Sequence, residues 1–165
     1  MAAHGNRIIL TPCFADPVEG YLASGETIYP GMIVQVDPTQ SRVGGKWAWK
    51  IYDRGADGDH PAGPHIVVTE DLLQGKTIDD AYGTGSGTRL FGAIPRAGCE
   101  LNLLFKNVSG TGDDVAAGDL FIVDDGTGKV IVTTGSPEEE VAMALDSITD
   151  PTADTLIWAM WGAGN

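Results

Sequence analysis

PHIVVTEDLLQGKTIDDAYGTGSGTRLFGAIP, residues 64–95, decides the fold because it joins two apolar segments through a turn-rich middle. The first segment, residues 65–69, is short, apolar and β-branched, which favours a strand and is too short for a buried helix. The second, residues 89–94, is mostly apolar after Arg89, also reads as a strand and is stopped by Pro95, which cannot donate a ladder hydrogen bond. We therefore expect two strands here.

The middle of this stretch predicts a single helical turn. Thr77 is followed three residues later by Asp80, an arrangement like a capping box with Asp in place of Glu. Asp79 and Asp80 also fall in the first turn, where the helix dipole favours acidic side chains. Gly83 ends the pattern, so we expect one short helix near residues 77–82.

Short apolar segments recur on both sides of this stretch, and none sustains a helical period for three turns. They cover residues 7–10, 32–36, 46–52, 99–106, 119–123, 129–133, 141–145 and 155–161. The chain of 165 residues also has 23 glycines and 9 prolines, which points to many turns. The sequence predicts an all-β fold, a compact β-barrel or β-sandwich with long Gly/Pro-rich loops.

One pattern is written twice in the chain. An offset of 87 residues aligns Gly31 with Gly118, Val36 with Val123 and Asp37 with Asp124. The same offset also aligns Arg42 with Lys129 and Val43 with Val130. Residues 28–94 and 115–161 could therefore be two copies of one unit. The alternative is convergence, because β proteins reuse this hairpin pattern. We divide the chain into an N-terminal arm with a first strand, residues 1–14, and one β domain, residues 15–165.

Acidic residues exceed basic ones by 23 to 10, for a formal charge of −13. The excess is concentrated late in the chain, since residues 107–165 carry eleven acids and one base, Lys129. This argues against nucleic acid or an anionic membrane as the partner, because both require basic surface. The acidity serves either solubility or a face that meets a basic partner or repels DNA.

The two cysteines, Cys13 and Cys99, have neither CxxC spacing nor a neighbouring histidine. The apolar run at residues 8–10 is too short for the core of a signal peptide, so we expect a reducing compartment. Free thiols are the prediction and a Cys13–Cys99 disulfide is the alternative.

No segment combines residues into a coherent active site. Asp57, Asp59, His60 and His65 could ligate a metal, but they stand in a Gly/Pro-rich loop where such residues are ordinary turn residues. The glycine-rich residues 83–87 lie before a strand, whereas phosphate-binding loops lead into a helix. We therefore expect no cofactor, no metal and no enzymatic activity.

Two groups of residues are candidates for contacts with a partner. Trp47 and Trp49 alternate along residues 46–52 and are expected on one face of a strand, either in the core or at an interface. The second group lies in the N-terminal arm, on the reasoning that terminal strands are easily shared between chains, so removing residues 1–14 should spare the fold. It consists of Arg7, Ile8, Ile9, Leu10 and Phe14.

The order of motifs resembles that of small capsid decoration, or cement, proteins of tailed bacteriophages. The resemblance is carried by residues 70–71 and 73–82, by residues 6–10 followed by 28–32, and by residues 117–120. It implies a structural protein of the virion exterior, made in the bacterial cytoplasm, that binds the major capsid protein and stabilises the expanded shell. It also implies a homotrimer, with a dimer as the alternative.

A second hypothesis is a β-rich module, displayed on a virion, that recognises a glycan or host surface. Its stacking platforms would be tryptophans. The chain has four of them, Trp47, Trp49, Trp158 and Trp161.

Overall fold

The structure, a computed structural model, describes residues 7–9, 16–23, 25–53, 64–83, 87–107, 114–133, 140–151 and 153–162. The elements are β1 (Asp16–Leu22), β2 (Ile33–Val36), β3 (Ala48–Ile51), β4 (Ile66–Val68), the 3₁₀ turn η1 (Leu72–Gln74), β5 (Arg89–Ile94), β6 (Glu100–Phe105), β7 (Leu120–Val123), β8 (Val130–Val132), β9 (Ala142–Ala144) and β10 (Thr155–Trp161). The predicted all-β fold is confirmed. No helix in these ranges is long and apolar enough to cross a membrane.

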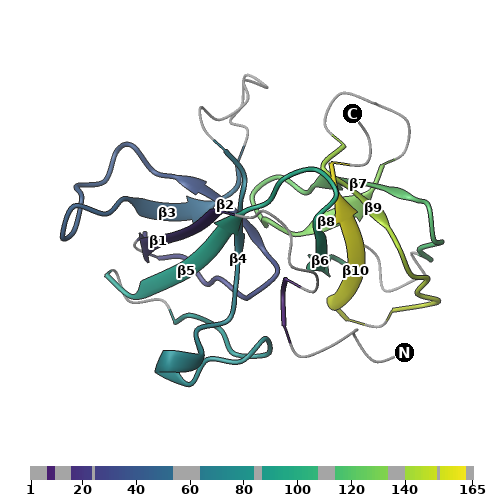
Figure 1. Cartoon of the computed structure of the whole chain (residues 1–165), viewed down its shortest axis with the longest axis horizontal. Coiled ribbons are helices and arrows are strands. Elements are labelled where there is room, and N and C mark those ends of the chain that lie inside the picture. The colour runs from purple at the N-terminus through teal and green to yellow at the C-terminus, as the bar shows by residue number, and fades with distance from the viewer. Residues whose placement is uncertain are drawn as a thin grey trace.

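The strands form two closed barrels that lie side by side (Figure 1). The first barrel has the strand order β1-β3-β2-β4-β5, and the second has the order β10-β6-β8-β7-β9. Closure leaves neither sheet with a long open edge.

The two barrels repeat one topology. Each pair of neighbouring strands in the first barrel has a counterpart in the second barrel whose strand numbers are higher by five. The single parallel pair follows this rule, since it is β1–β3 in the first barrel and β6–β8 in the second. The remaining four pairs are antiparallel in both barrels. The repeated units run from β1 to β5 and from β6 to β10, so each begins one strand earlier than the expected copies at residues 28–94 and 115–161.

Strand register refines the alignment of the two halves. Val36 and Val123 occupy equivalent positions, as the offset of 87 predicts, because each ends the second strand of its barrel. Val36 pairs with Trp49, however, and Val123 pairs with Val130. The predicted equivalence of Val43 and Val130 is therefore wrong, because the first hairpin is longer and Trp49 takes that place.

The interior of the first barrel is built around Trp49. A Cβ atom on Gly20 would lie 2.3 Å from the Trp49 ring, and one on Gly92 would lie 3.2 Å from it. Gly20 therefore lets β1 pass the indole, whereas Gly92 chiefly lets β5 pass β4, because a Cβ there would lie 2.7 Å from Ile66 Cγ2 and 2.9 Å from the Val67 carbonyl oxygen. Trp49 is only 2% exposed and packs with Leu22, Val34 and other apolar side chains of the first barrel.

The two barrels share a junction at β2 and β4. Val34 faces the first barrel's interior, whereas its neighbour Ile33 and the cross-strand partner Val67 face the second barrel's core. This explains why both strands are buried on both faces. Gly31, with φ of 85°, brings the backbone close enough for the Leu104 amide to donate to its carbonyl at 3.0 Å.

The N-terminal segment is part of the second core in its described residues, 7–9. Ile8 is fully buried there, its amide donates to Glu70 Oε2 at 3.1 Å, and its carbonyl accepts from the Asn102 amide at 2.7 Å. In place of the expected strand at residues 7–10, the described residues 7–9 form one bridge, from Ile9 to Leu101. Removal of this segment would open the core, so the expectation of a separable arm does not hold for residues 7–9.

The first true strand is β1, which the sequence did not predict. Pro17 and Gly20 interrupt its pattern, but Pro17 is tolerated because β1 pairs with β3 only at Tyr21 and Leu22. Among the described strands only β5 pairs with the start of β1, so no amide is required of Pro17 toward β3.

Cys99 corrects the expectation of free thiols. It is buried beside the second barrel's core and is disulfide-bonded. The sequence contains one other cysteine, Cys13, which lies outside the described residues.

Candidate partner interface

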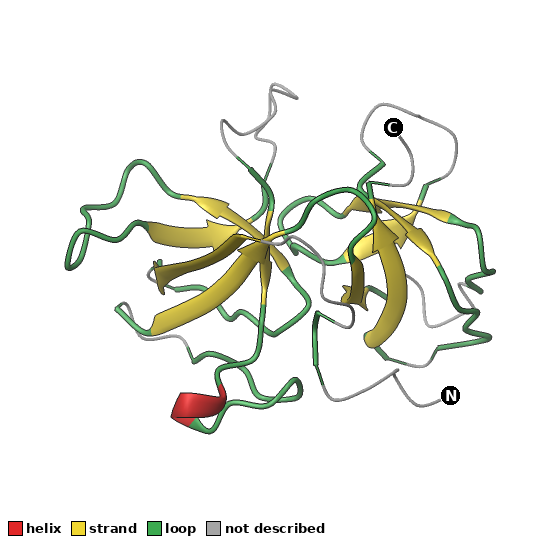
Figure 2. Ribbon diagram, viewed as in Figure 1, coloured by secondary structure: helices red, strands yellow, loops and turns green. Residues whose placement is uncertain are grey.

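A loop between β4 and β5, residues 69–82, projects from the first barrel, and we call it the Leu loop. In Figure 2 it carries the red helical turn below that barrel. The bridge between Ile28 and Tyr82 closes it, as the bridge between Val115 and Ile148 closes the equivalent loop of the second barrel. Tyr82 follows Val68 by 14 residues, but Ile148 follows the equivalent Ala144 by four. The Leu loop is therefore longer than barrel closure requires.

The tip of the Leu loop is a small hairpin. The Lys76 amide donates to the Asp71 carbonyl at 2.8 Å, and the Gly75 amide donates to the Leu72 carbonyl at 3.2 Å. Gly75 has φ of 70°, which permits the tight return. Asp71 Oδ1 accepts from the Leu73 amide at 3.1 Å, an Asx-type turn that fixes the two leucines relative to the barrel.

The second turn of the Leu loop forms the predicted capping contacts without a helix. Asp80 Oδ2 accepts from the Thr77 amide at 2.9 Å and from the Thr77 hydroxyl at 2.8 Å. These two hydrogen bonds hold the pKa of Asp80 below its ordinary value. The predicted helix at residues 77–82 is wrong because the chain turns back at once to the bridge at Tyr82, and the only helical turn in the described residues is η1.

Tyr82 anchors the base of the Leu loop. It is fully buried in the first barrel, and its hydroxyl donates to the Thr69 carbonyl at 2.7 Å. Burial, aided by the charges of Asp71 and Glu70, raises the pKa of the Tyr82 hydroxyl, which keeps it a donor. Lys76 Nζ adds a bond to the Ala81 carbonyl at 2.9 Å. The loop is thus held from both sides.

This framework displays two leucines to solvent. Leu72 is 63% exposed and Leu73 is 89% exposed. They border a groove of about 480 Å³ that is also lined by Arg7, Ile9, Pro17 and Phe91. An ordered loop with uncovered apolar side chains has little conformational entropy to lose on binding, which favours a contact with a partner.

Other candidate residues are scattered by the fold. Trp49 and Ile8 are core residues, so neither offers a surface. Trp47 lies outside β3 and is 38% exposed, with the Arg42 guanidinium 3.7 Å from its ring centroid. Arg7 is exposed and Ile9 half-buried beside the Leu loop groove. Leu10 and Phe14 lie outside the described residues.

Metal-binding groups are absent from the part of the chain that the structure describes, where no three His, Cys, Asp or Glu side chains gather suitably. Of the candidate ligands, His65 stacks on Tyr52 at 5.0 Å and meets the edge of Trp161 at 5.9 Å. Asp57, Asp59 and His60 lie outside the described residues.

The sequence interpretation did not select Leu72 and Leu73 as contact residues. A usable signal was present, because two adjacent leucines between Asp71 and Gly75 belong to a turn and have no periodic apolar partners. Adjacent large apolar residues in a turn cannot both be buried by one neighbouring sheet.

Comparison with protein-family models and with curated proteins found no match to the chain.

Proposed function

We propose that the protein is a capsid decoration protein of a tailed bacteriophage, which binds the outside of the expanded shell and stabilises it. The observation that carries the proposal is the ordered Leu loop, which presents Leu72 and Leu73 to solvent. The loop lies inside the stretch that resembles decoration proteins. Its leucines would enter an apolar depression on the major capsid protein.

A decoration protein acts by mass action. If its contacts exist only in the expanded lattice, binding stabilises that lattice over the unexpanded or broken shell. Such a role needs a rigid body and a defined contact rather than a bond-making site. The closed barrels and the hydrogen-bonded loop supply both.

The chemistry of the partner site follows from the surroundings of the leucines. The Leu loop carries three acidic residues that are at least partly exposed, Glu70, Asp79 and Asp80, besides the buried Asp71, and one basic residue, Lys76. Charge complementarity then requires basic side chains around the apolar depression of the capsid protein. Binding should weaken as the salt concentration rises, because charges at the rim of an interface are screened.

The tryptophans favour this role over glycan recognition. Trp49 and Trp161 are buried, Trp158 is half-buried along β10, and Arg42 covers one face of Trp47. A stacking platform needs a free aromatic face, so the first hypothesis is the better supported one.

Sedimentation with empty phage shells tests the proposal. We expect saturable binding to expanded shells, much weaker binding to unexpanded shells, and a higher rupture temperature for decorated shells. No retention is expected on a panel of bacterial polysaccharides. Equal binding to both shell states, or no binding to either, would overturn the proposal.

A further inference from the structure

The repeated topology leaves one face of the second barrel without the cover that its counterpart has. In the first barrel, the paired residues Ile33 and Val67 face outward and are fully buried against the second barrel. Their equivalents by register are Leu120 and Met143, which are also paired. Both are apolar, yet both are only half-buried. The second barrel thus keeps a docking face like the one that the first barrel uses within the chain.

The surface that receives the first barrel also has a counterpart. Within the chain, the segment that starts β2 is held between β6 and β8: the Leu104 amide donates to Gly31 at 3.0 Å, and the Ile33 amide donates to Gly128 at 2.6 Å. By register, Leu104 corresponds to Tyr21 and Gly128 to Trp47. This counterpart surface is accessible, since Trp47 is 38% exposed.

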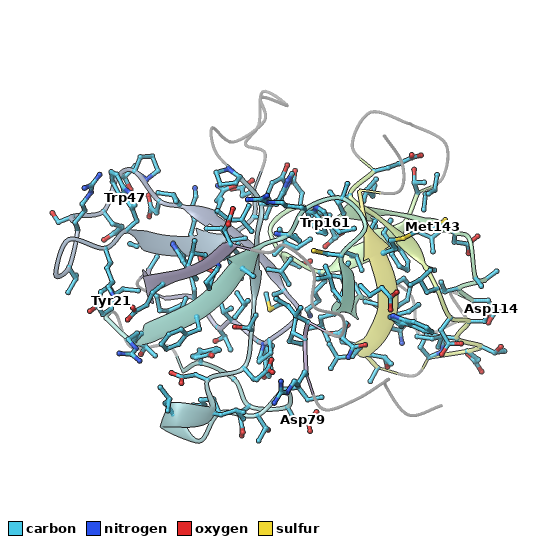
Figure 3. The ribbon with its side chains drawn as sticks, in the orientation of Figure 1. Tyr21, Trp47, Asp79, Asp114, Met143 and Trp161 are labelled. Carbon is cyan, nitrogen blue, oxygen red and sulfur yellow. The ribbon has the colours of Figure 1, made fainter. Side chains whose placement is uncertain are left out.

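The docking face and the receiving surface lie at opposite ends of the molecule. Figure 3 shows Trp47 and Tyr21 at the first-barrel end and Met143 with Asp114 at the other. Copies placed end to end would therefore bring the two surfaces together without competing with the contact between barrels in each chain.

Charge also complements between the ends. Lys46 and Arg89 both pair with Glu19 beside Tyr21, so basic residues outnumber acidic ones in this group, and Arg42 adds a further positive charge over Trp47. The opposite end carries exposed or half-exposed carboxylates around the docking face, from Asp114, Asp119 and Asp150. Residues 100–161, which span the second barrel, have two basic residues, Lys106 and Lys129, and they pair with Asp124 and Asp154. Opposite charges thus face each other in an end-to-end contact.

We infer that copies of this chain associate head to tail, with Leu120 and Met143 of one copy packed over Tyr21 and Trp47 of the next. The contact uses, between chains, the faces that are equivalent by register to those of the junction between the two barrels within a chain. Such a heterologous contact closes into a ring when its rotation permits and extends into a filament when it does not. The inference does not depend on what the Leu loop binds.

One difference sets the strength of the contact. On the receiving surface, the Tyr21 amide donates to the Trp47 carbonyl at 3.0 Å, so these two backbone groups already bond to each other. The equivalent groups of Leu104 and Gly128 instead bond to residues 31 and 33, which lie between them. Contact between copies therefore lacks the two backbone hydrogen bonds of the internal junction. We expect association that depends on protein concentration and weakens with added salt.

Two variants and their mixture test the head-to-tail geometry by mass photometry and sedimentation velocity. Met143→Glu blocks the docking face and Trp47→Glu blocks the receiving surface, and both side chains are at least partly exposed. Each variant alone should need at least tenfold more protein than the wild type to associate. Their equimolar mixture should form a one-to-one dimer, because one intact contact remains in each mixed pair. Leu73→Ser is the control and should associate like the wild type.

Three results would overturn the inference. They are a wild-type protein that stays monomeric at every concentration, variants that associate like the wild type, and a mixture that stays monomeric. Circular dichroism and the melting temperature establish that each variant is folded. If a variant is not folded, the test uses the wild type alone. Its association should then require at least tenfold more protein at high salt than at low salt, and association unaffected by salt would overturn the inference.

Discussion

The hydroxyl of Tyr82 donates a 2.7 Å hydrogen bond to the carbonyl of Thr69, 13 residues earlier, and so closes the Leu loop across its base. Tyr82→Phe removes this bond and keeps the ring, which should lower the free energy of unfolding by about 1 kcal/mol. Amide exchange in residues 71–80 should accelerate, and affinity for expanded shells should fall about three- to tenfold as the loop loses its preorganisation. Tyr29→Phe is the matched control, because Tyr29 is 40% exposed. Unchanged exchange in Tyr82→Phe would show that the bond does not order the loop.

Gly20 should be intolerant of a methyl group, because its Cβ would lie 2.3 Å from the ring of Trp49. Gly20→Ala should destabilise the protein by about 1–3 kcal/mol through overpacking. Gly83→Ala is the control, since a Cβ there meets nothing within 4 Å. Denaturant unfolding of the two variants measures the difference. Equal stability of both would mean that Trp49 can shift at little cost.

The disulfide at Cys99 predicts a stability that depends on redox conditions. Reduction should lower the free energy of unfolding by about 2–4 kcal/mol, because the unfolded chain gains conformational freedom. Melting curves with and without a reductant measure this loss. The Cys99→Ser protein should melt at the same temperature under both conditions. A wild-type melting temperature unaffected by full reduction would contradict the prediction.

Acid should loosen the turn between Thr77 and Asp80. The hydrogen bonds from Thr77 lower the pKa of Asp80 below its ordinary value of 3.8. A lowered carboxyl pKa means that the stabilisation is complete above 3.8 and is lost as the pH falls through the lower, folded-state pKa. The Thr77 amide proton should titrate with that pKa in NMR spectra, and Asp80→Asn should abolish the titration. A titration midpoint above the ordinary value would be the wrong sign.

Hydrophobic pattern predicted the strands that are apolar throughout. Residues 89–94 and 155–161 match β5 and β10 at both ends, because continuous apolar or alternating runs have no other stable placement in an all-β chain. The repeat was also visible, since Val36 and Val123 end equivalent strands. The alignment of the two halves failed at the strand that follows, because the first hairpin is longer than the second. Trp49, and not Val43, is therefore the residue equivalent to Val130.

Tertiary contacts decided the features that local pattern could not predict. β1 contains Pro17 and Gly20, two residues that local pattern counts against a strand. Gly20 is needed there because the Trp49 ring packs against it, and Pro17 is tolerated because the described part of β3 does not pair with the start of β1. Trp47 and Trp49 differ in burial because β3 begins at Ala48 and leaves Trp47 in the hairpin turn beside Arg42. Each case depends on a residue more than four positions away in sequence.

The candidate interface was predictable only in part. The resemblance pointed to the stretch that contains the Leu loop, and the capping contacts of Thr77 were expected. Which side chains remain uncovered depends on the absence of a packing partner in space, and sequence alone does not show that. Leu72 and Leu73 were therefore found from the structure.

The most direct test of the central claim is the affinity of the double variant Leu72→Ser/Leu73→Ser for expanded phage shells. Both side chains are exposed, so the variant should unfold within about 0.5 kcal/mol of the wild type. Burial of two leucines in a partner stabilises the complex by about 3 kcal/mol or more, so binding should weaken at least about 100-fold. Val43→Ser, at another exposed apolar residue, should bind like the wild type. A double variant that is folded and binds shells with wild-type affinity would contradict the account.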